Sequence, residues 1–198
     1  MINGSPKKNG NTFIALSEVA KALQEQGVET EIIGIGAKAV QGCIGCGRCS
    51  ELGRCAFKDD LYMEIQPKLA EADGYVFGSP TYYAGPNGSL CALLDRLFYS
   101  CSSLMAYKPG AAVAVCRRGG CDSVFDRLNK YFTINNMPVV PSQYWNSVHG
   151  AAPGEASQDL EGLQIMRVLG RNMAWMIKHL KNTEHPEKEN PIRTNFIR

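Results

Sequence analysis

Gly4-Ser5-Pro6-Lys7-Lys8-Asn9-Gly10-Asn11-Thr12 is the stretch that decides the fold. It follows a short apolar start and opens into a helical pattern that begins at Thr12. A strand, a loop rich in Gly, Ser and Asn, and a helix N-terminus form a common phosphate site in α/β proteins. Backbone N–H groups converge there, and the helix dipole favours an anion. Side chains of the loop add hydrogen-bond donors and positive charge: Ser5, Lys7, Lys8, Asn11 and Thr12.

The spacing of the glycines indicates which phosphate this loop suits. A Walker loop needs Gly-x4-Gly-Lys-Ser/Thr. Here five residues separate Gly4 from Gly10, and the residue directly before Thr12 is not a lysine. The dinucleotide pattern Gly-x-Gly-x-x-Gly is also absent. A single terminal phosphate, as on FMN, fits better. The alternative interpretation is an ordinary β–α turn capped by Asn or Thr.

Length, charge and hydropathy limit the class of protein. The chain has 198 residues, 44% of them hydrophobic, which is enough for one substantial core in about one domain. The net charge of +2 indicates neither nucleic acid nor an anionic membrane as a partner. The N-terminus lacks the apolar core of a signal peptide, and no apolar run approaches membrane-spanning length. We therefore expect a cytoplasmic protein.

Outward from the loop, the hydrophobic pattern alternates between strands and helices. Met1–Asn3 is short for a first strand, which is therefore either stunted or trimmed. Further strands are predicted at residues 28–35, 74–78 and 111–116, and a last one from Val139-Val140. Helices are predicted from Thr12 to a cap at Gly27, and around Leu61–Leu69 after caps at Asp59 and Asp60, with a break at Pro67. Others are predicted after caps at Ser89 and Asp122, and from about Glu155 to Lys181 with Leu160 in the buried stripe.

This alternation predicts a doubly wound, five-stranded parallel sheet of order 2-1-3-4-5 with helices on both faces. Ligands of such sheets bind at the carboxyl ends of the strands, where the strand order reverses. Three loops are expected to converge there: residues 4–12, 79–88 and 117–121. This arrangement suits FMN, with the phosphate on the first loop and the isoalloxazine ring between the other two.

Four of the eight cysteines lie close together in the pattern Cys43-x2-Cys46-x2-Cys49-x5-Cys55. In a reducing compartment such a cluster indicates metal binding or redox chemistry. Four thiolates are the normal ligand set of a [4Fe–4S] cluster. Structural zinc is one alternative, and bare thiols or a disulfide formed on purification are the other. The remaining cysteines are interpreted as small buried hydrophobic residues: Cys91, Cys101, Cys116 and Cys121.

The first loop, together with Gly78-Ser79-Pro80-Thr81-Tyr82-Tyr83 and the pair Asp95-Arg96, resembles the flavodoxin-like NAD(P)H-dependent FMN reductase superfamily. Within that superfamily, the cysteine motif resembles that of the iron–sulfur flavoproteins and multimeric flavodoxins. The resemblance covers roughly Gly4 to Lys181. It implies a flavodoxin-like FMN domain over residues 1–182, with the cysteine-rich loop at 42–57 and an extended tail at 183–198.

The resemblance also implies which residues hold the cofactor. Ser5, Lys7, Asn11 and Thr12 would hold the phosphate. Pro80, Thr81, Tyr82 and Tyr83 would line the ring. It further implies a homodimer or homotetramer with FMN at the interface, reduced by a nicotinamide or a ferredoxin-type donor. The exposed loop around Tyr144, Trp145 and His149 would then cover a partner's flavin, although ordinary packing is the alternative for each residue.

Residues after the fourth strand are candidates for tuning the flavin. Arg117 or Arg118, with the N–H groups of Gly119 and Gly120, would place positive charge near N1 and O2 of the ring, which favours two-electron chemistry. The alternative is that both arginines are surface charges. No acid–base triad is present or required, because the flavin carries the chemistry.

Two hypotheses for function remain after this reading. The first is an oxidoreductase that transfers electrons from NAD(P)H to a flavin, quinone or similar acceptor. The second is an iron–sulfur flavoprotein electron carrier reduced by ferredoxin. A phosphoryl-receiving regulator on the same fold is excluded, because Asn3-Gly4 and Gly78-Ser79 stand where that class needs acidic residues.

Overall fold

The computed structural model describes residues 1–187, 189–194 and 196. Its helices and strands alternate along the chain in this order: β1 (Ile2–Asn3), α1 (Asn11–Glu25), β2 (Ile33–Gly34), α2 (Cys49–Leu52), α3 (Asp60–Ile65), α4 (Lys68–Glu71), β3 (Tyr75–Tyr82), β4 (Gly85–Pro86), α5 (Gly88–Met105), β5 (Gly110–Cys116), α6 (Cys121–Thr133), β6 (Ser147–His149), a 3₁₀ turn η1 (Glu155–Gln158) and α7 (Leu160–Leu180).

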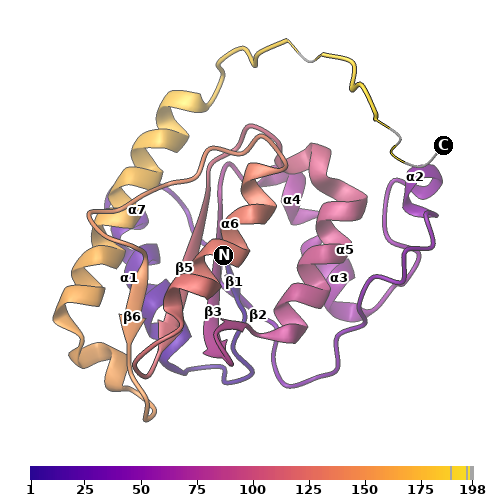
Figure 1. Ribbon diagram of the computed structural model, residues 1–198. Helices are drawn as coiled ribbons and strands as arrows, with labels where there is room; N and C mark the ends of the chain where they lie inside the picture. The colour runs from indigo at the N-terminus through magenta and orange to yellow at the C-terminus, as the bar shows by residue number, and fades with distance from the viewer. Residues whose placement is uncertain (188, 195, 197–198) are drawn as a thin grey trace.

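The main sheet is parallel with the order β2-β1-β3-β5-β6, and β4 adds an antiparallel hairpin to β3. Counted without that hairpin, this is the predicted order 2-1-3-4-5, which is confirmed. Helices α1 and α7 cover one face of the sheet, and α3 to α6 cover the other (Figure 1).

The residues of β3 show why both faces are filled. Tyr75 and Phe77 point into the core beneath α3 to α6, and Val76 points into the core beneath α1 and α7. All three side chains are buried, because side chains alternate across a strand and helices cover both faces of this sheet. On the α1 and α7 side, Gly170 lets the two helices approach closely, since a Cβ there would lie 2.6 Å from the Cβ of Ala22.

Two predicted strands are wrong in extent or place. Only Ile33–Gly34 of the predicted strand 28–35 pairs with β1, because β1 itself offers only two residues as a partner. The last strand is Ser147–His149, not the segment that begins at Val139-Val140. Val139 makes a single bridge to Gly110, after which the chain leaves the sheet and returns through β6.

Three predicted helix starts are also wrong. Asn87, not Ser89, caps α5, because its side chain accepts a hydrogen bond from the N–H of Ser89. Gly120, in a left-handed conformation, precedes α6 in place of Asp122, which lies in the first turn. The helix predicted from about Glu155 begins at Leu160 behind the cap Asp159, and Leu160 is exposed although its apolar side chain had suggested burial.

Other local predictions are confirmed. Gly27 ends α1 with φ 75°, and the N–H of Val28 bonds to the carbonyl of Leu23, as in a Schellman motif. Pro67 separates α3 from α4, because it cannot continue a hydrogen-bonded helix. Asp59 caps α3 by accepting a hydrogen bond from the N–H of Tyr62.

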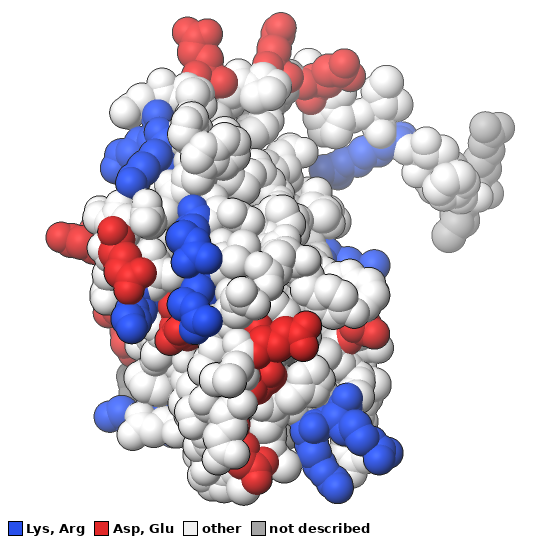
Figure 2. Space-filling model, turned by 90° about the vertical axis from the view of Figure 1, so that its left-hand side faces the viewer, with Lys and Arg blue, Asp and Glu red and all other residues white. Residues whose placement is uncertain are grey.

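The surface on the α7 side carries both signs of charge in small groups between large neutral areas (Figure 2). Among the described helices, none combines the length and the apolar character that crossing a bilayer requires. Beyond α7, the described tail residues form no helix or strand, and the chain runs across the molecule from the end of α7 toward α2 (Figure 1). Residues 188, 195, 197 and 198 of the predicted tail lie outside the described residues, and the boundary at 182 stays a prediction.

Candidate flavin site and cysteine loop

The first loop begins against the middle of β3. The N–H of Gly4 donates to the carbonyl of Gly78 at 2.7 Å, and a Cβ on Gly4 would lie only 2.7 Å from that same oxygen. The side chain of Asn3 accepts from the N–H of Ser5, and the hydroxyl of Ser5 accepts from the N–H of Lys7. These two turns curl the loop back over the start of α1, whose first N–H groups have no acceptor within the helix.

The predicted phosphate residues differ in their surroundings. Ser5 and Thr12 are buried at the base of the loop, and Lys7 is exposed at its rim. Asn11, predicted to offer its side chain, uses it elsewhere. Its amide donates to the carbonyl of Ala152 and accepts from the N–H groups of Gly154 and Ala156. Asn11 therefore anchors residues 152–156 beside the loop with its side chain, while its backbone N–H belongs to the first turn of α1.

The second predicted loop is a tight hairpin between β3 and β4. Tyr83 and Ala84 have φ of 49° and 56°, as a type I′ turn requires, although neither is glycine. Such strained positions persist only where their surroundings hold them, and they cluster at functional sites. Tyr83 is fully exposed and Tyr82 about half exposed, so both rings are available to a ligand or a partner chain.

The third predicted loop packs against this hairpin. Gly120 has φ 88°, and a Cβ on it would lie 3.0 Å from Cγ2 of Thr81 and 3.1 Å from Cα of Ala84. Gly119 and both arginines beside it are exposed. Loops 79–88 and 117–121 therefore meet as predicted, while loop 4–12 meets residues 150–156, a neighbour that the sequence did not indicate.

Buried polar groups at this edge show where a ligand has room to bond. The hydroxyl oxygen of Thr81 is buried and lacks a hydrogen-bond partner of normal geometry in the described part of the chain. The thiol of Cys121 lies beside this hydroxyl and interacts with it, and a polar ligand atom beside the hairpin would give it a partner of better geometry. The N–H groups at the start of α1 and this hydroxyl together fit a flavin mononucleotide.

Charge at the site comes from Arg117 and the loop facing it. The N–H groups of Ala152 and Ala151, followed by the positive charge of Arg117, hold the pKa of Glu155 below its usual range. Arg117 thus lies near enough to residues 151–155 to act on them electrostatically. Burial raises the pKa of the nearby Cys121 thiol to about 12.

The cysteine loop forms a second candidate site on the far side of α5. Cys43, Cys46, Cys49 and Cys55 all line one cavity of about 140 Å³, which Phe57, Arg96 and Tyr99 close from below. Cys43 and Cys46 are exposed, and Cys49 and Cys55 are half-buried. The four sulfurs do not all lie within 4.8 Å of one another, whereas tetrahedral zinc with Zn–S bonds of ~2.3 Å needs its sulfurs about 3.8 Å apart. The open quartet therefore suits a multi-atom cluster better than a single ion.

Arg96 holds this loop to the core, a role that the sequence did not indicate. Its side chain is completely buried, and it donates to the carbonyls of Gln41 and Phe57 and to the sulfur of Cys55. It also forms an ion pair with Asp59. Burial alone would lower the pKa of Arg96, but the bonds to Cys55 and Asp59 raise it above its usual value, so the guanidinium stays charged.

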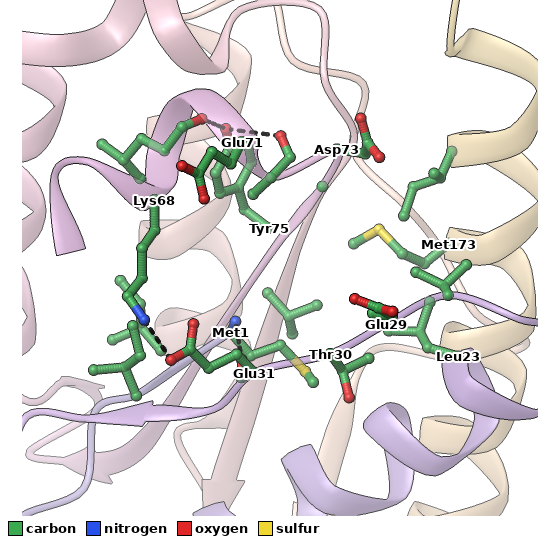
Figure 3. Close-up of a pocket in the computed structure, with 18 of the residues that line it drawn as sticks. Met1, Leu23, Glu29, Thr30, Glu31, Lys68, Glu71, Asp73, Tyr75 and Met173 are labelled. Atoms are coloured by element: carbon green, nitrogen blue, oxygen red, sulfur yellow. Dashed lines mark hydrogen bonds and ion pairs between the residues drawn. The ribbon is translucent and has the colours of Figure 1, made fainter. Parts of the chain in front are cut away.

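A cavity of about 780 Å³, larger than that of the cysteine loop, lies at the opposite, amino end of the sheet. Figure 3 shows it between Met1, residues 29–31 and Tyr75, with Lys68 paired to Glu31 at one side. The space is hollow because β1 spans two residues, so no strand fills the gap between the chain before β2 and the start of β3. No predicted cofactor residue lines this cavity.

The parallel order, with residues 4–12 at its reversal point and loops 79–88 and 117–121 at the same edge, defines a flavodoxin-like fold of the kind that binds flavin. A family model described as NADPH-dependent FMN reductase matches residues 1–152, and the chain belongs to that family.

Relatives and solved structures agree with this assignment. An iron-sulfur flavoprotein of Methanocaldococcus jannaschii is 37% identical over 188 residues, covering 91% of this chain and 97% of the relative. Another iron-sulfur flavoprotein, from Methanosarcina thermophila, is 30% identical and covers 83% and 87%. The crystal structure of RosB with a bound 8-demethyl-8-formylriboflavin-5′-phosphate intermediate has a TM-score of 0.74 at 14% identity, covering 98% of this chain and 90% of RosB. This last likeness shows the fold.

Proposed function

We propose that this chain binds FMN at the carboxyl edge of the sheet and passes electrons from NAD(P)H to a flavin, quinone or similar acceptor. The observation that carries the proposal is the meeting of loops 79–88 and 117–121 at Gly120, at the same edge of the sheet as residues 4–12, which lead into the N-terminus of α1. FMN supplies the electron transfer when it is bound, and the residues of the chain hold and tune it.

In this proposal each part of the edge has one task. Ser5, Lys7 and Thr12, with the backbone N–H of Asn11, bind the phosphate. Pro80, Thr81, Tyr82 and Tyr83 line the ring, and the hydroxyl of Thr81 bonds to a polar ring atom. Arg117, Gly119 and Gly120 place positive charge and N–H donors near the pyrimidine end.

The electron donor separates this proposal from the alternative, an electron carrier reduced by ferredoxin. We expect NADPH or NADH to bleach the flavin absorption of the FMN-loaded protein under anaerobic conditions, and to be consumed steadily when a quinone or free FMN is added. If reduced ferredoxin reduces the bound flavin and neither NADPH nor NADH does so, the reductase hypothesis is wrong and the electron-carrier hypothesis takes its place.

We further propose that Cys43, Cys46, Cys49 and Cys55 hold a [4Fe–4S] cluster. The shared cavity of the quartet and the iron-sulfur flavoproteins among the relatives support this proposal. Protein purified and reconstituted anaerobically is expected to contain about four irons and four acid-labile sulfides per chain. A reconstituted protein that contains neither iron nor acid-labile sulfide, or that contains one zinc ion per four cysteines, would contradict the proposed cluster.

The proposed assembly is a cytoplasmic homodimer or homotetramer. Exposed aromatic rings just before β6 support a partner chain, since Tyr144 and Trp145 lie 4.9 Å apart between ring centroids and each is more than half exposed. Ferredoxin stays a candidate partner of the cysteine loop.

A further inference from the structure

A second group of metal-binding side chains lies at the ends of β5 and β6. Cys116 ends β5, Cys121 begins α6, and His149 ends β6. Cys116 and His149 are register partners on neighbouring parallel strands, so their side chains emerge on the same face of the sheet. The two sulfurs and one ring nitrogen of His149 all lie within 4.8 Å of one another. No other set of this kind occurs among the described residues.

We propose that Cys116, Cys121 and His149 form a three-ligand site for a zinc-like divalent cation, separate from the cysteine loop. Tetrahedral zinc separates two sulfur ligands by about 3.8 Å, and a sulfur from a nitrogen by about 3.5 Å, given bonds of roughly 2.3 and 2.0–2.1 Å. The atoms lie within 4.8 Å of one another, so the distances need to shorten by about 1.3 Å at most. Two thiolates and an imidazole are also the donor set that zinc prefers over magnesium or calcium.

Asp159 supports His149 in the way that carboxylates support metal-binding histidines. One oxygen of Asp159 accepts from the N–H of Gly162 and caps α7. The other accepts from the backbone N–H of His149 and lies 3.5 Å from Nδ1 of its ring. A carboxylate beside Nδ1 orients the imidazole and fixes its tautomer, which leaves Nε2 as the nitrogen for a metal.

The surroundings of the three ligands suit an ion with one open position. Cys116 and Cys121 are buried, but the side chain of His149 is half exposed, so the group opens to solvent on one side. Three protein ligands with a free fourth position are typical of zinc sites that bind water or a small molecule. The burial expected for Cys116 and Cys121 is confirmed. The metal site gives His149, which ends β6, a role other than the cover over a partner's flavin that the resemblance implied.

The test is the zinc content of the flavin-loaded protein after anaerobic equilibrium dialysis against zinc, measured by mass spectrometry. The wild-type chain is expected to hold one equivalent more than Cys121→Ser and one more than His149→Gln. Cys43→Ser/Cys46→Ser is the matched control, because it disables the other candidate site and should retain this equivalent. Asp159→Asn keeps an oxygen to cap α7 and should weaken zinc binding by about 10- to 100-fold.

The proposal fails if the zinc content of wild type, Cys121→Ser and His149→Gln is the same. It also fails if mass spectrometry finds Cys116 joined to Cys121 as a disulfide in the anaerobically prepared protein. His149→Gln alters a half-exposed side chain, so this variant is expected to fold. Its zinc content therefore still tests the proposal if Cys121→Ser does not fold. Loss of FMN binding or of nicotinamide oxidation would not bear on this result, because the three ligands belong to the chain itself.

Discussion

Replacing Arg96 with leucine is expected to lower the free energy of unfolding by about 3 kcal/mol, the range for breaking a buried ion pair by removing one partner. The guanidinium is completely buried, whereas the carboxylate of Asp59 is about one third exposed, so water will stabilise Asp59 in part. The carbonyls of Gln41 and Phe57 would also lose their donor, at a cost of roughly 1–3 kcal/mol for each group that stays buried and unpaired. Urea unfolding followed by circular dichroism measures the loss.

A surface ion pair provides the matched control for this substitution. Arg167 pairs with Glu18 at 2.6 Å, but its side chain is 40% exposed, so Arg167→Leu should cost less than about 1 kcal/mol. Arg96→Lys keeps the positive charge but loses the planar guanidinium and its several N–H donors. Its free energy of unfolding should therefore lie between those of the wild type and Arg96→Leu. Equal losses for Arg96→Leu and Arg167→Leu would show that Arg96 does not hold the cysteine loop to α5.

The second large effect is expected for Gly4→Ala in the phosphate loop. The added methyl group would lie 2.6 Å from Cδ2 of Leu90 and 2.7 Å from the carbonyl oxygen of Gly78. Leu90 can shift, but the carbonyl belongs to the backbone of β3, so the loop must move away from the sheet. Overpacking of this kind costs about 1–3 kcal/mol. Because the same displacement moves the phosphate donors, the Kd for FMN should rise about 10- to 100-fold.

Riboflavin and a second glycine separate this effect from general destabilisation. Riboflavin lacks the phosphate, so titration calorimetry should show a smaller loss of affinity for it than for FMN in Gly4→Ala. Gly88→Ala adds a methyl group with no atom within 4 Å, at the first residue of α5, and should change stability by less than about 0.5 kcal/mol. Unchanged FMN affinity in a folded Gly4→Ala protein would mean that the phosphate binds elsewhere.

Much of the fold could be predicted because it depends on local patterns. The glycine-rich loop before Thr12, the cap at Gly27 and the break at Pro67 all express preferences of a few neighbouring residues. The strand order was predictable as well, since regular β–α alternation allows few arrangements. The last strand was not predictable, because Ser147–His149 is polar at both ends and pairs only through its neighbour β5.

Arg96 shows why part of the site could not be predicted. It lies in a helix between the apolar residues Leu94 and Leu97, where a charged residue normally faces solvent. It is buried because residues 41–59 fold over α5, and the sequence pattern carries no sign of that contact. The spacing Cys116-x4-Cys121 was visible in the sequence, but its meeting with His149 was not.

By itself, the sequence determined the alternation of strands and helices, the phosphate-type loop and the crowding of four cysteines, because each depends on residues that are close along the chain. The tertiary structure alone decided the contacts over long separations: Asn11 with residues 152–156, Arg96 with the cysteine loop, and His149 with the two cysteines. The physical reason is that such contacts form only when the sheet brings distant segments to one edge, and no local preference encodes which segments those are.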